Sequence, residues 1–413
     1  MDNNQSTKSE TKFIAYDNLD KIGEVAVYYG FAPAKSPNIT KADLDAAKDI
    51  LEGDYVDDNT GMHGRLPLHV EEKIALIRIY EELHMHLLSQ PVMFYFKDPC
   101  KNRLKKSGHA RYADLEILGL SGSIAEATLI QTARAMLTNE GYDNTLVEIN
   151  SIGDKDSMMR FVRELVAYYR KNLNEMSPEC RQLFKNDPFE LLASHDESCK
   201  ALNAAAPRAM DFLSEESRRH LEEVLEYLET LKIPYILNNG LLGNRKYCTE
   251  TIFTIVNTGV AEKKSGEQQI LAVGTRYNGL AKRLGNKRDI QGVGISLLIK
   301  EGQNGLRKPL TKLKRPIASF VQLGLESKLL SLDIIERLRQ VKIPLYLSLA
   351  KDRLGAQVSS VEKYHTPYVI VMGKKEAVEK TAIVRRNDTH AQAIVPLEEL
   401  PKYMKKIEEG LNR

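Results

Sequence analysis

Residues 317–372 constrain the fold most, because short apolar runs alternate there with segments of helical spacing. The runs have the length of strands, and the segments between them repeat apolar residues every three or four positions. A strand that returns parallel to its neighbour needs a crossover, usually a helix, so the alternation predicts an α/β domain with a largely parallel sheet. We expect strands at 317–323, 345–347 and 368–372, with helices at 329–341 and 354–364.

The C-terminal quarter that holds this alternation is strongly basic. Residues 306–413 contain 21 Lys and Arg against 12 Asp and Glu, whereas the whole chain has a formal net charge of only +3. The remainder is therefore net acidic. A basic domain on an acidic body is expected when one end of a protein meets a polyanion, and a solvated basic surface gives the same pattern. The charge alone leaves both interpretations open.

Composition and length exclude several classes of protein. A length of 413 residues provides two or three domains, and 42% hydrophobic residues is ordinary for a soluble globular chain. No apolar run approaches the roughly 20 residues that span a bilayer. Residues 1–12 are polar and lack the apolar stretch of a signal peptide, so we expect a disordered tail there. Four scattered cysteines cannot form a dense disulfide framework, which favours a cytoplasmic protein.

The first three quarters of the chain mix strands and helices around a long charged segment. Residues 156–231 are almost entirely helical and contain three prolines, which predicts several helices in a separate module. We place this module at 160–228, inserted in a core at 13–306. A polar, basic linker at 307–315 separates that core from the C-terminal domain at 316–413. Outside the module, we expect helices at 17–29, 70–88 and 125–140, and strands at 91–96, 115–120, 145–149, 235–237, 251–256 and 270–273.

Four blocks of sequence, spread over the chain, carry a resemblance to one protein family. They are Tyr29-Gly30-Phe31 leading to Pro37, residues 148–156 with the helical module through Ile233-Pro234-Tyr235, Gly274-Thr-Arg-Tyr-Asn-Gly-Leu280 followed by Gly292-Val-Gly294, and the basic C-terminal domain. In these blocks the chain resembles the class II histidyl-tRNA synthetases. The blocks correspond to the motif 1 entry, the insertion region, the glycine-rich turn ahead of motif 3, and the anticodon-binding domain shared with glycyl, threonyl and prolyl enzymes.

The resemblance implies a fold and a set of partners. The implied fold class is α/β, with an α+β class II synthetase core on an antiparallel sheet, a helical insertion module and a C-terminal α/β domain of the anticodon-binding type. The implied partners are tRNA or another RNA, and a second copy of the chain, because motif 1 forms the class II dimer interface. No membrane partner is implied, and a further enzyme partner is left open.

The resemblance also implies a reaction, in which the carboxylate of histidine attacks the α-phosphate of ATP. Two anions must meet, so catalysis depends on cations that stabilise the charge in transit. Arginine suits this task because its planar fork donates two hydrogen bonds to phosphate oxygens. The family places arginines in motif 2, in a histidine-specific segment and at the end of motif 3. In this sequence those positions are occupied by Asn102, Gly243 and Glu301.

Three missing arginines predict a protein that does not activate an amino acid, because removal of one such cation typically costs a factor of about 100–1,000 in rate. The expected function is tRNA or RNA binding, or a regulatory role, without a cofactor. One alternative is an active histidine–tRNA ligase, using ATP and Mg²⁺, in which Arg103, Arg245 and Lys300 replace the lost cations. Another is a regulatory subunit resembling the synthetase-like partner of ATP phosphoribosyltransferase, which usually lacks a C-terminal domain.

Part of the family's histidine-binding pocket is retained in the sequence. The resemblance assigns Glu71 and Glu116 to the α-amino group of the substrate, although solvated or paired surface carboxylates remain an equal interpretation. Tyr112 stands where the family has a glutamine ahead of the second glutamate. The expected ligand-binding residues are Glu71, Tyr112, Glu116, Tyr247, Arg276 and Tyr277.

Two further groups of residues are candidates for binding. Basic side chains in the linker and at the end of a predicted strand are candidates for phosphate contacts, which give salt-dependent affinity for RNA. They are Lys312, Lys314, Arg315, Arg385 and Arg386. Cys180 and Cys199 resemble half of a four-cysteine set found in some family members, with Ser177 and Ser194 at the other two positions. Two thiolates make a poor tetrahedral zinc site, so we expect free structural cysteines and no metal.

Overall fold

The computed structural model describes residues 19–51, 69–97, 110–194, 196–259, 269–300, 316–347, 357 and 365–411. The predicted tail at 1–12, the linker at 307–315 and, apart from Gln357, the expected helix at 354–364 lie outside these residues. Within the described ranges, no helix is long and apolar enough to cross a membrane.

A sheet of eight strands forms the centre of the core. The sheet is antiparallel except at its two edges, where β1 pairs parallel with β2 and β4 with β5. This arrangement confirms the antiparallel core sheet predicted from the sequence. In spatial order the strands are β1 (Ala32–Ala34), β2 (Val92–Lys97), β3 (Ala110–Leu118), β8 (Gly292–Lys300), β7 (Gln269–Arg276), β6 (Thr249–Asn257), β4 (Thr145–Gly153) and β5 (Tyr235–Leu237).

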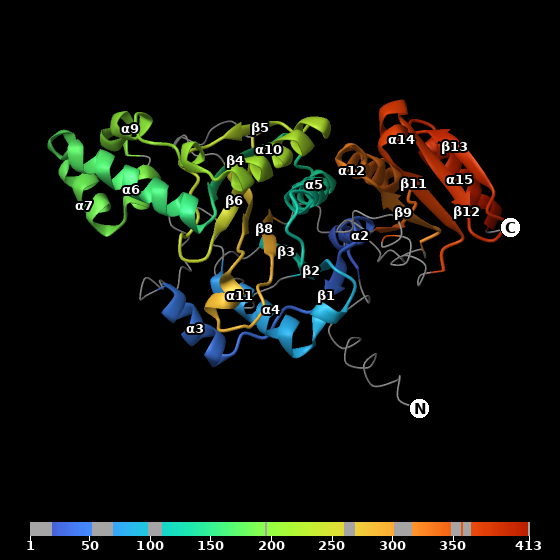
Figure 1. Cartoon of the computed structure of the whole chain (residues 1–413), viewed down its shortest axis with the longest axis horizontal. Helices are drawn as coiled ribbons and strands as arrows, with labels where there is room; N and C mark the ends of the chain where they lie inside the picture. The colour runs from blue at the N-terminus through green and yellow to red at the C-terminus, as the bar shows by residue number, and fades with distance from the viewer. Residues whose placement is uncertain are drawn as a thin grey trace.

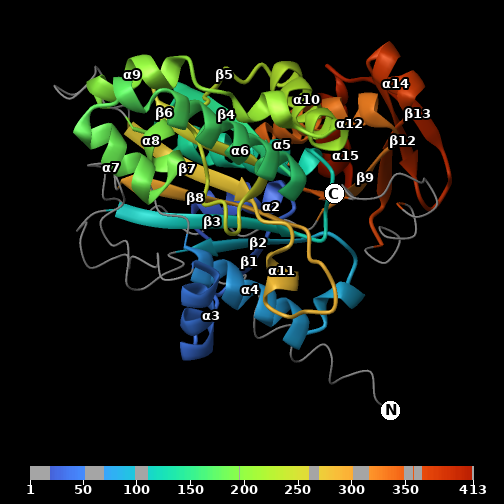
Figure 2. The ribbon, with the colours of Figure 1, turned by 60° about the vertical axis from the view of Figure 1, so that its left-hand side comes forward.

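Helices cover both faces of this sheet (Figure 2). On one face lie α2 (Lys21–Tyr28), α5 (Ile124–Asn139) and α10 (Glu215–Thr230), and on the other lie α3 (Lys41–Leu51), α4 (Val70–Glu82) and α11 (Leu280–Arg283). Side chains alternate across a strand, so Leu115 and Ile117 of β3 pack toward α5 while Glu116 between them points toward α4. The two faces therefore have separate buried clusters, and the predicted ligand residues divide between them.

The helical module consists of α6 (Lys155–Lys171), α7 (Pro178–Asn186), α8 (Pro188–Leu192) and α9 (Glu197–Ala204). It lies at one end of the large sheet, and the C-terminal domain lies at the other (Figure 1). Two of the prolines that interrupt the segment begin helices, at Pro178 and Pro188, where the missing N–H is not needed. The buried side chains of α10 join the cluster beneath α5, and its N-terminal end is hydrogen-bonded to α6.

The expectation of free cysteines in this module is wrong, because Cys180 of α7 and Cys199 of α9 form a disulfide. Their Cα atoms are 5.9 Å apart, although 19 positions separate them in the sequence. The sequence does not show that α9 returns beside α7, and this packing brings the two thiols together. The serine next to the pair is Ser198, whose Oγ is 3.6 Å from Cys180 Sγ and 3.2 Å from Ser177 Oγ.

The C-terminal domain has a five-stranded sheet in which β9 (Ala318–Gln322) is the second strand from one edge. In spatial order the strands are β10 (Leu345–Leu347), β9, β11 (Tyr368–Met372), β12 (Thr381–Arg386) and β13 (Gln392–Pro396). Its helices are α12 (Leu325–Gln340), α14 (Lys374–Glu379) and α15 (Leu400–Leu411). The prediction of a largely parallel sheet is wrong for half of it, because β11, β12 and β13 pair antiparallel. The last two form a hairpin, which needs no crossover helix.

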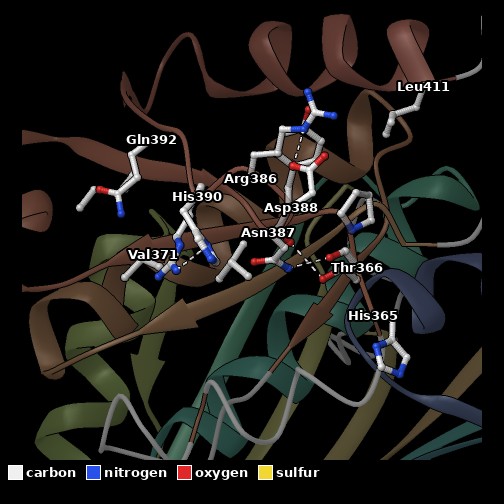
Figure 3. Close-up of a pocket in the computed structure, with 14 residues that line it drawn as sticks. His365, Thr366, Val371, Arg386, Asn387, Asp388, His390, Gln392 and Leu411 are labelled. Atoms are coloured by element: carbon white, nitrogen blue, oxygen red, sulfur yellow. Dashed lines mark hydrogen bonds and ion pairs between the residues drawn. The ribbon is translucent and has the colours of Figure 1, made fainter.

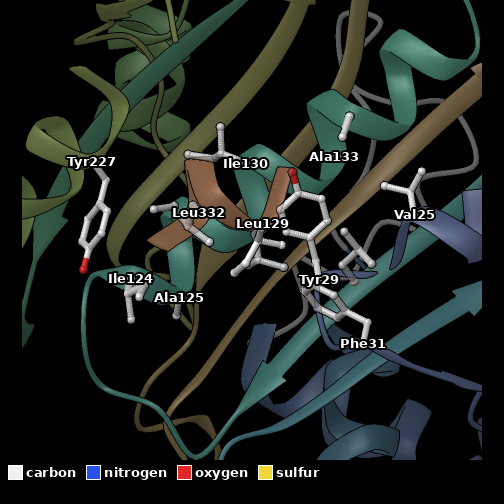
Figure 4. Close-up of a cluster of buried hydrophobic side chains, with 14 of the residues drawn as sticks. Val25, Tyr29, Phe31, Ile124, Ala125, Leu129, Ile130, Ala133, Tyr227 and Leu332 are labelled. Atoms are coloured by element: carbon white, nitrogen blue, oxygen red, sulfur yellow. The ribbon is translucent and has the colours of Figure 1, made fainter. Parts of the chain in front are cut away.

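The helix α12 packs the C-terminal domain onto the core. Its Leu332 belongs to the same buried apolar cluster as Leu129 of α5 (Figure 4). The Tyr29 hydroxyl donates a hydrogen bond of 2.7 Å to Glu336 Oε2, and Arg339 holds the same carboxylate at 2.6 Å. Burial raises the pKa of Tyr29 well above its ordinary value. The motif 1 residue Tyr29 is thus covered by the chain's own C-terminal domain, and the homodimer stays a prediction.

Candidate functional site

Three side chains from different elements meet on the α4 face of the large sheet. Lys73 projects from α4, Glu116 from the middle of β3, and Tyr277 from the turn that follows β7. The Lys73 ammonium donates to Glu116 Oε1, and the Tyr277 hydroxyl donates to Glu116 Oε2 at 2.7 Å. Lys73 Nζ also lies 5.8 Å from the centroid of the Tyr277 ring. Both carboxylate oxygens of Glu116 are therefore occupied within the chain.

The charges in this cluster are fully buried, with 2% of the Lys73 side chain and 3% of the Glu116 side chain exposed. Burial lowers the pKa of Lys73, but the carboxylates of Glu116 and Asp114 outweigh it and raise that pKa above its ordinary value. Burial also raises the pKa of Glu116, while Lys73 and Tyr277 act against it. A buried pair of this kind is stable only while each charge keeps its partner.

Other predicted ligand residues lie close to this cluster. Glu71 is buried, with its Oε1 2.9 Å from His69 Nδ1. Tyr247 is buried in a turn after position 244, and burial, together with the neighbouring Cys248 and the charge of Glu71, raises the pKa of its hydroxyl. Tyr112 is half-buried in β3, on the strand face of Glu116. Glu116 and Tyr277 are in direct contact, and the charge of Glu71 acts on Tyr247; the assignment of these four residues to ligand binding stays a prediction.

A small cavity lies beside Glu116 on this face of the sheet. The cavity beside Glu116 has a volume of about 10 Å³, which suffices for no more than one water molecule. Its walls are formed by Pro37, Glu72, Leu76, Phe96, Asp114 and Glu116. Among the described residues, no group of three or more His, Cys, Asp or Glu side chains is arranged to hold a metal ion.

The assignment of Arg276 to ligand binding is wrong, because its guanidinium lies on the α5 side of the sheet and is completely buried. It forms a two-pronged ion pair with Glu126 of α5, with distances of 2.7 Å and 2.6 Å. Its Nη1 donates to the Leu120 carbonyl at 2.9 Å. Arg276 and Tyr277 are adjacent, so they point to opposite faces of the sheet. The arginine therefore has a structural role.

Two further side chains donate hydrogen bonds to the Glu126 carboxylate. His220 Nε2 lies 2.9 Å from Glu126 Oε1, and the Thr251 hydroxyl donates to that oxygen at 2.7 Å. Burial raises the pKa of Glu126, but the charges of Arg276 and His220 outweigh this effect and hold the pKa far below its ordinary value. The network ties α5, α10, β6 and β7 together.

The C-terminal domain has a much larger pocket, of about 910 Å³ (Figure 3). It is lined by residues from the loop before β11, from β12 and from the hairpin after β12. Arg385 Nη2 lies 2.8 Å from His390 Nδ1, and Arg386 Nε lies 2.7 Å from Asp388 Oδ1. The structure therefore brings the two predicted RNA-binding arginines to one pocket, together with two histidines, His365 and His390.

Comparisons with known proteins agree with this architecture. The family model described as "Anticodon binding domain" matches residues 325–407. The chain is 24% identical to the histidine–tRNA ligase of Caldanaerobacter subterraneus, over 92% of this chain and 93% of the relative. It is 26% identical to that of Desulforamulus reducens, with the same coverage. The solved apo histidyl-tRNA synthetase of S. aureus has the same fold, with a TM-score of 0.50, 21% identity, and coverage of 93% and 94%.

Over most of its length the chain is therefore similar to histidine–tRNA ligases, and residues 325–407 match an anticodon-binding domain. Its sequence departs from the family at three arginine positions, of which the structure describes one. At Gly243 there is no space for a side chain, because a Cβ would lie 2.7 Å from Cys248 Sγ and 2.9 Å from Ile252 Cδ1. In this structure, the position matched to the family's arginine is therefore packed against Cys248 and Ile252.

Arg245, which replaces a lost cation in the active-ligase alternative, is paired elsewhere. Its Nη2 forms an ion pair of 3.0 Å with Asp187, and its guanidinium lies 5.9 Å from the centroid of the Phe189 ring. Both partners belong to α8 or its cap, so the cation is held by the helical module. Arg245 is thus a contact between this loop and the module.

Several residues that the sequence analysis singled out for catalysis or RNA binding lie outside the described residues. These are Asn102, Arg103 and Glu301, and the linker residues Lys312, Lys314 and Arg315. Lys300 is described only in its backbone, as the last residue of β8, paired with Ala110.

Sequence reasoning missed two residues that organise the site, although the sequence contains a signal for each. Lys73 lies on the apolar face of its helix, between Val70 and Ile77, where a charged residue interrupts the spacing. Glu126 similarly interrupts an apolar helical run. A charge on a buried face needs a partner inside the protein, and the structure supplies Glu116 for Lys73 and Arg276 for Glu126.

Proposed function

We propose that this chain is a member of the histidyl-tRNA synthetase family that does not activate histidine and acts as a tRNA-binding or RNA-binding protein. One observation carries the first part: Lys73 pairs with Glu116, one of the two carboxylates matched to the substrate ammonium group, and the cavity beside Glu116 has a volume of about 10 Å³. Histidine is far larger than the single water that such a space admits. The arginine position at Gly243 adds support, because it has neither a cation nor room for one.

Pyrophosphate exchange tests the loss of activation. We expect no histidine-dependent and ATP-dependent exchange above background, because each missing cation lowers the rate by a factor of about 100–1,000. The histidine–tRNA ligase of Desulforamulus reducens is the positive control in the same buffer. Exchange by this protein at a rate comparable to that control would contradict the proposal and favour the active ligase.

The RNA-binding part is supported by the match to an anticodon-binding domain and by the pocket in that domain. Arg385 and Arg386 are adjacent on β12, and both line this pocket of about 910 Å³. A guanidinium beside a histidine or a single carboxylate keeps donors available for phosphate oxygens. The pocket is large enough for a nucleotide, and Tyr368 is among the residues that line it.

Binding of bulk tRNA measured over a range of salt concentrations tests this part. We expect affinity to fall as salt rises, and the double variant Arg385→Ala/Arg386→Ala to lower the slope of log K against log salt by about one unit for each lost contact. The matched control is Lys374→Ala/Lys375→Ala, which removes two exposed cations of α14 outside the pocket. Equal effects of the two double variants, or affinity that does not change with salt, would remove the RNA-binding proposal.

A further inference from the structure

We propose that Lys73 is a built-in ligand, whose ammonium group occupies a binding site for primary ammonium ions formed by Glu116 and Tyr277. The three side chains come from α4, β3 and the turn after β7, so the site is made by tertiary packing and not by one element. The inference concerns the same pocket as the proposed function, but it does not depend on RNA binding.

The geometry around Glu116 shows the features of a cation site. Tyr277 donates to Oε2 at 2.7 Å and so fixes the orientation of the carboxylate, while Oε1 accepts from the ammonium group. The carboxylate lies against the backbone of β8 at Gly294, where a Cβ would collide with it. The ammonium group also lies over the Tyr277 ring, 5.8 Å from its centroid, and the face of such a ring attracts cations.

These contacts select a primary ammonium ion as the ligand class. An NH₃⁺ group brings three donors and a compact charge, which suit one carboxylate oxygen in a narrow, buried space. A quaternary ammonium ion has no donor for Glu116, and an alcohol has no charge to balance it. In the wild-type chain the site is closed to free ligands, because the stem and ammonium group of Lys73 fill it and leave about 10 Å³ beside Glu116.

Truncation of Lys73 tests the proposal, because Lys73→Ala removes a chain of three carbons and an ammonium group. These atoms correspond to n-propylammonium. We expect this ion to stabilise Lys73→Ala in a saturable manner, lowering its unfolding equilibrium constant about 11-fold at ten times its Kd. At equal ionic strength, 1-propanol and tetramethylammonium are expected to have no such effect, and n-propylammonium is expected not to stabilise the wild type.

A double variant and a refolding experiment complete the test. In Lys73→Ala/Glu116→Gln the response to n-propylammonium should be lost, so a response that persists overturns the proposal. Where Lys73→Ala does not fold alone, refolding from urea with and without n-propylammonium is the readout, and recovery of folded protein supports the site. If neither Lys73→Ala nor Lys73→Ser gains stability or folded yield from the amine, the proposal is wrong. None of these readouts uses ATP, pyrophosphate or RNA, so a failure here leaves the proposed function standing, and the reverse also holds.

Discussion

Replacing Arg276 with methionine is expected to lower the free energy of unfolding by about 3–5 kcal/mol at pH 7, because it leaves Glu126 as a buried charge without its main partner. The arginine is completely buried and makes two contacts with that carboxylate, at 2.7 Å and 2.6 Å. Methionine fills much of the same volume, so the loss arises from the charge more than from a cavity. Chemical denaturation of the two proteins measures the difference.

The pH dependence of this difference follows from the pKa of Glu126. Burial raises that pKa, but the charges of Arg276 and His220 outweigh burial and hold it well below the ordinary value of 4.5. A depressed carboxyl pKa contributes stability above the ordinary value, and this contribution is lost as the pH falls below it. The gap between wild type and Arg276→Met is therefore expected to narrow between pH 5 and pH 3.

A surface arginine provides the matched control for this prediction. Arg219→Met removes an ion pair with Glu215 in which the side chains are 66% and 90% exposed. Exposed pairs of this kind contribute about 0–1 kcal/mol. If Arg276→Met cost no more than Arg219→Met, or if its cost were the same at pH 3 and pH 7, the structural role assigned to Arg276 would be wrong.

Arg276 and Tyr277 show that the sequence does not predict which face of the sheet a side chain occupies. Both residues belong to the glycine-rich motif at Gly274–Leu280. The strand before it was expected at 270–273 and is observed as β7 at Gln269–Arg276. Which of two adjacent side chains faces the pocket depends on the register of β7 with β8, a tertiary property that a single sequence does not contain. The motif therefore assigned both residues to ligand binding, and only the structure shows that Arg276 faces away from Glu116.

The fold was predicted best where apolar spacing is regular. The spacing at 329–341 predicted a helix, confirmed as α12 at Leu325–Gln340, and the run at 368–372 was confirmed as β11. The antiparallel direction of the strands after β11 was not predicted. A hairpin gives antiparallel strands and a crossover gives parallel ones, and the sequences of the strands themselves do not distinguish the two connections. The disulfide was missed for a similar reason, since it depends on how α7 and α9 pack.

The last prediction concerns the charge balance between Lys73 and Glu116. Glu116→Gln is expected to lower the free energy of unfolding by about 3–5 kcal/mol, because Lys73 then remains as a buried ammonium ion without its carboxylate. Glutamine keeps an oxygen that can accept from the Tyr277 hydroxyl, so the loss reports the charge. The matched control is Glu215→Gln on the surface, expected to cost less than about 1 kcal/mol.

A double-mutant cycle separates this pairing from a general effect of the substitution. In Lys73→Met/Glu116→Gln no buried charge of the pair is left, so the double variant is expected to be more stable than Glu116→Gln alone, although a destabilising change has been added. Chemical denaturation of the wild type, the two single variants and the double variant measures the coupling. If the losses in free energy of unfolding of the two single variants added up in the double variant, the two groups would not stabilise each other. The proposal that Lys73 occupies the ammonium site of Glu116 would then be wrong.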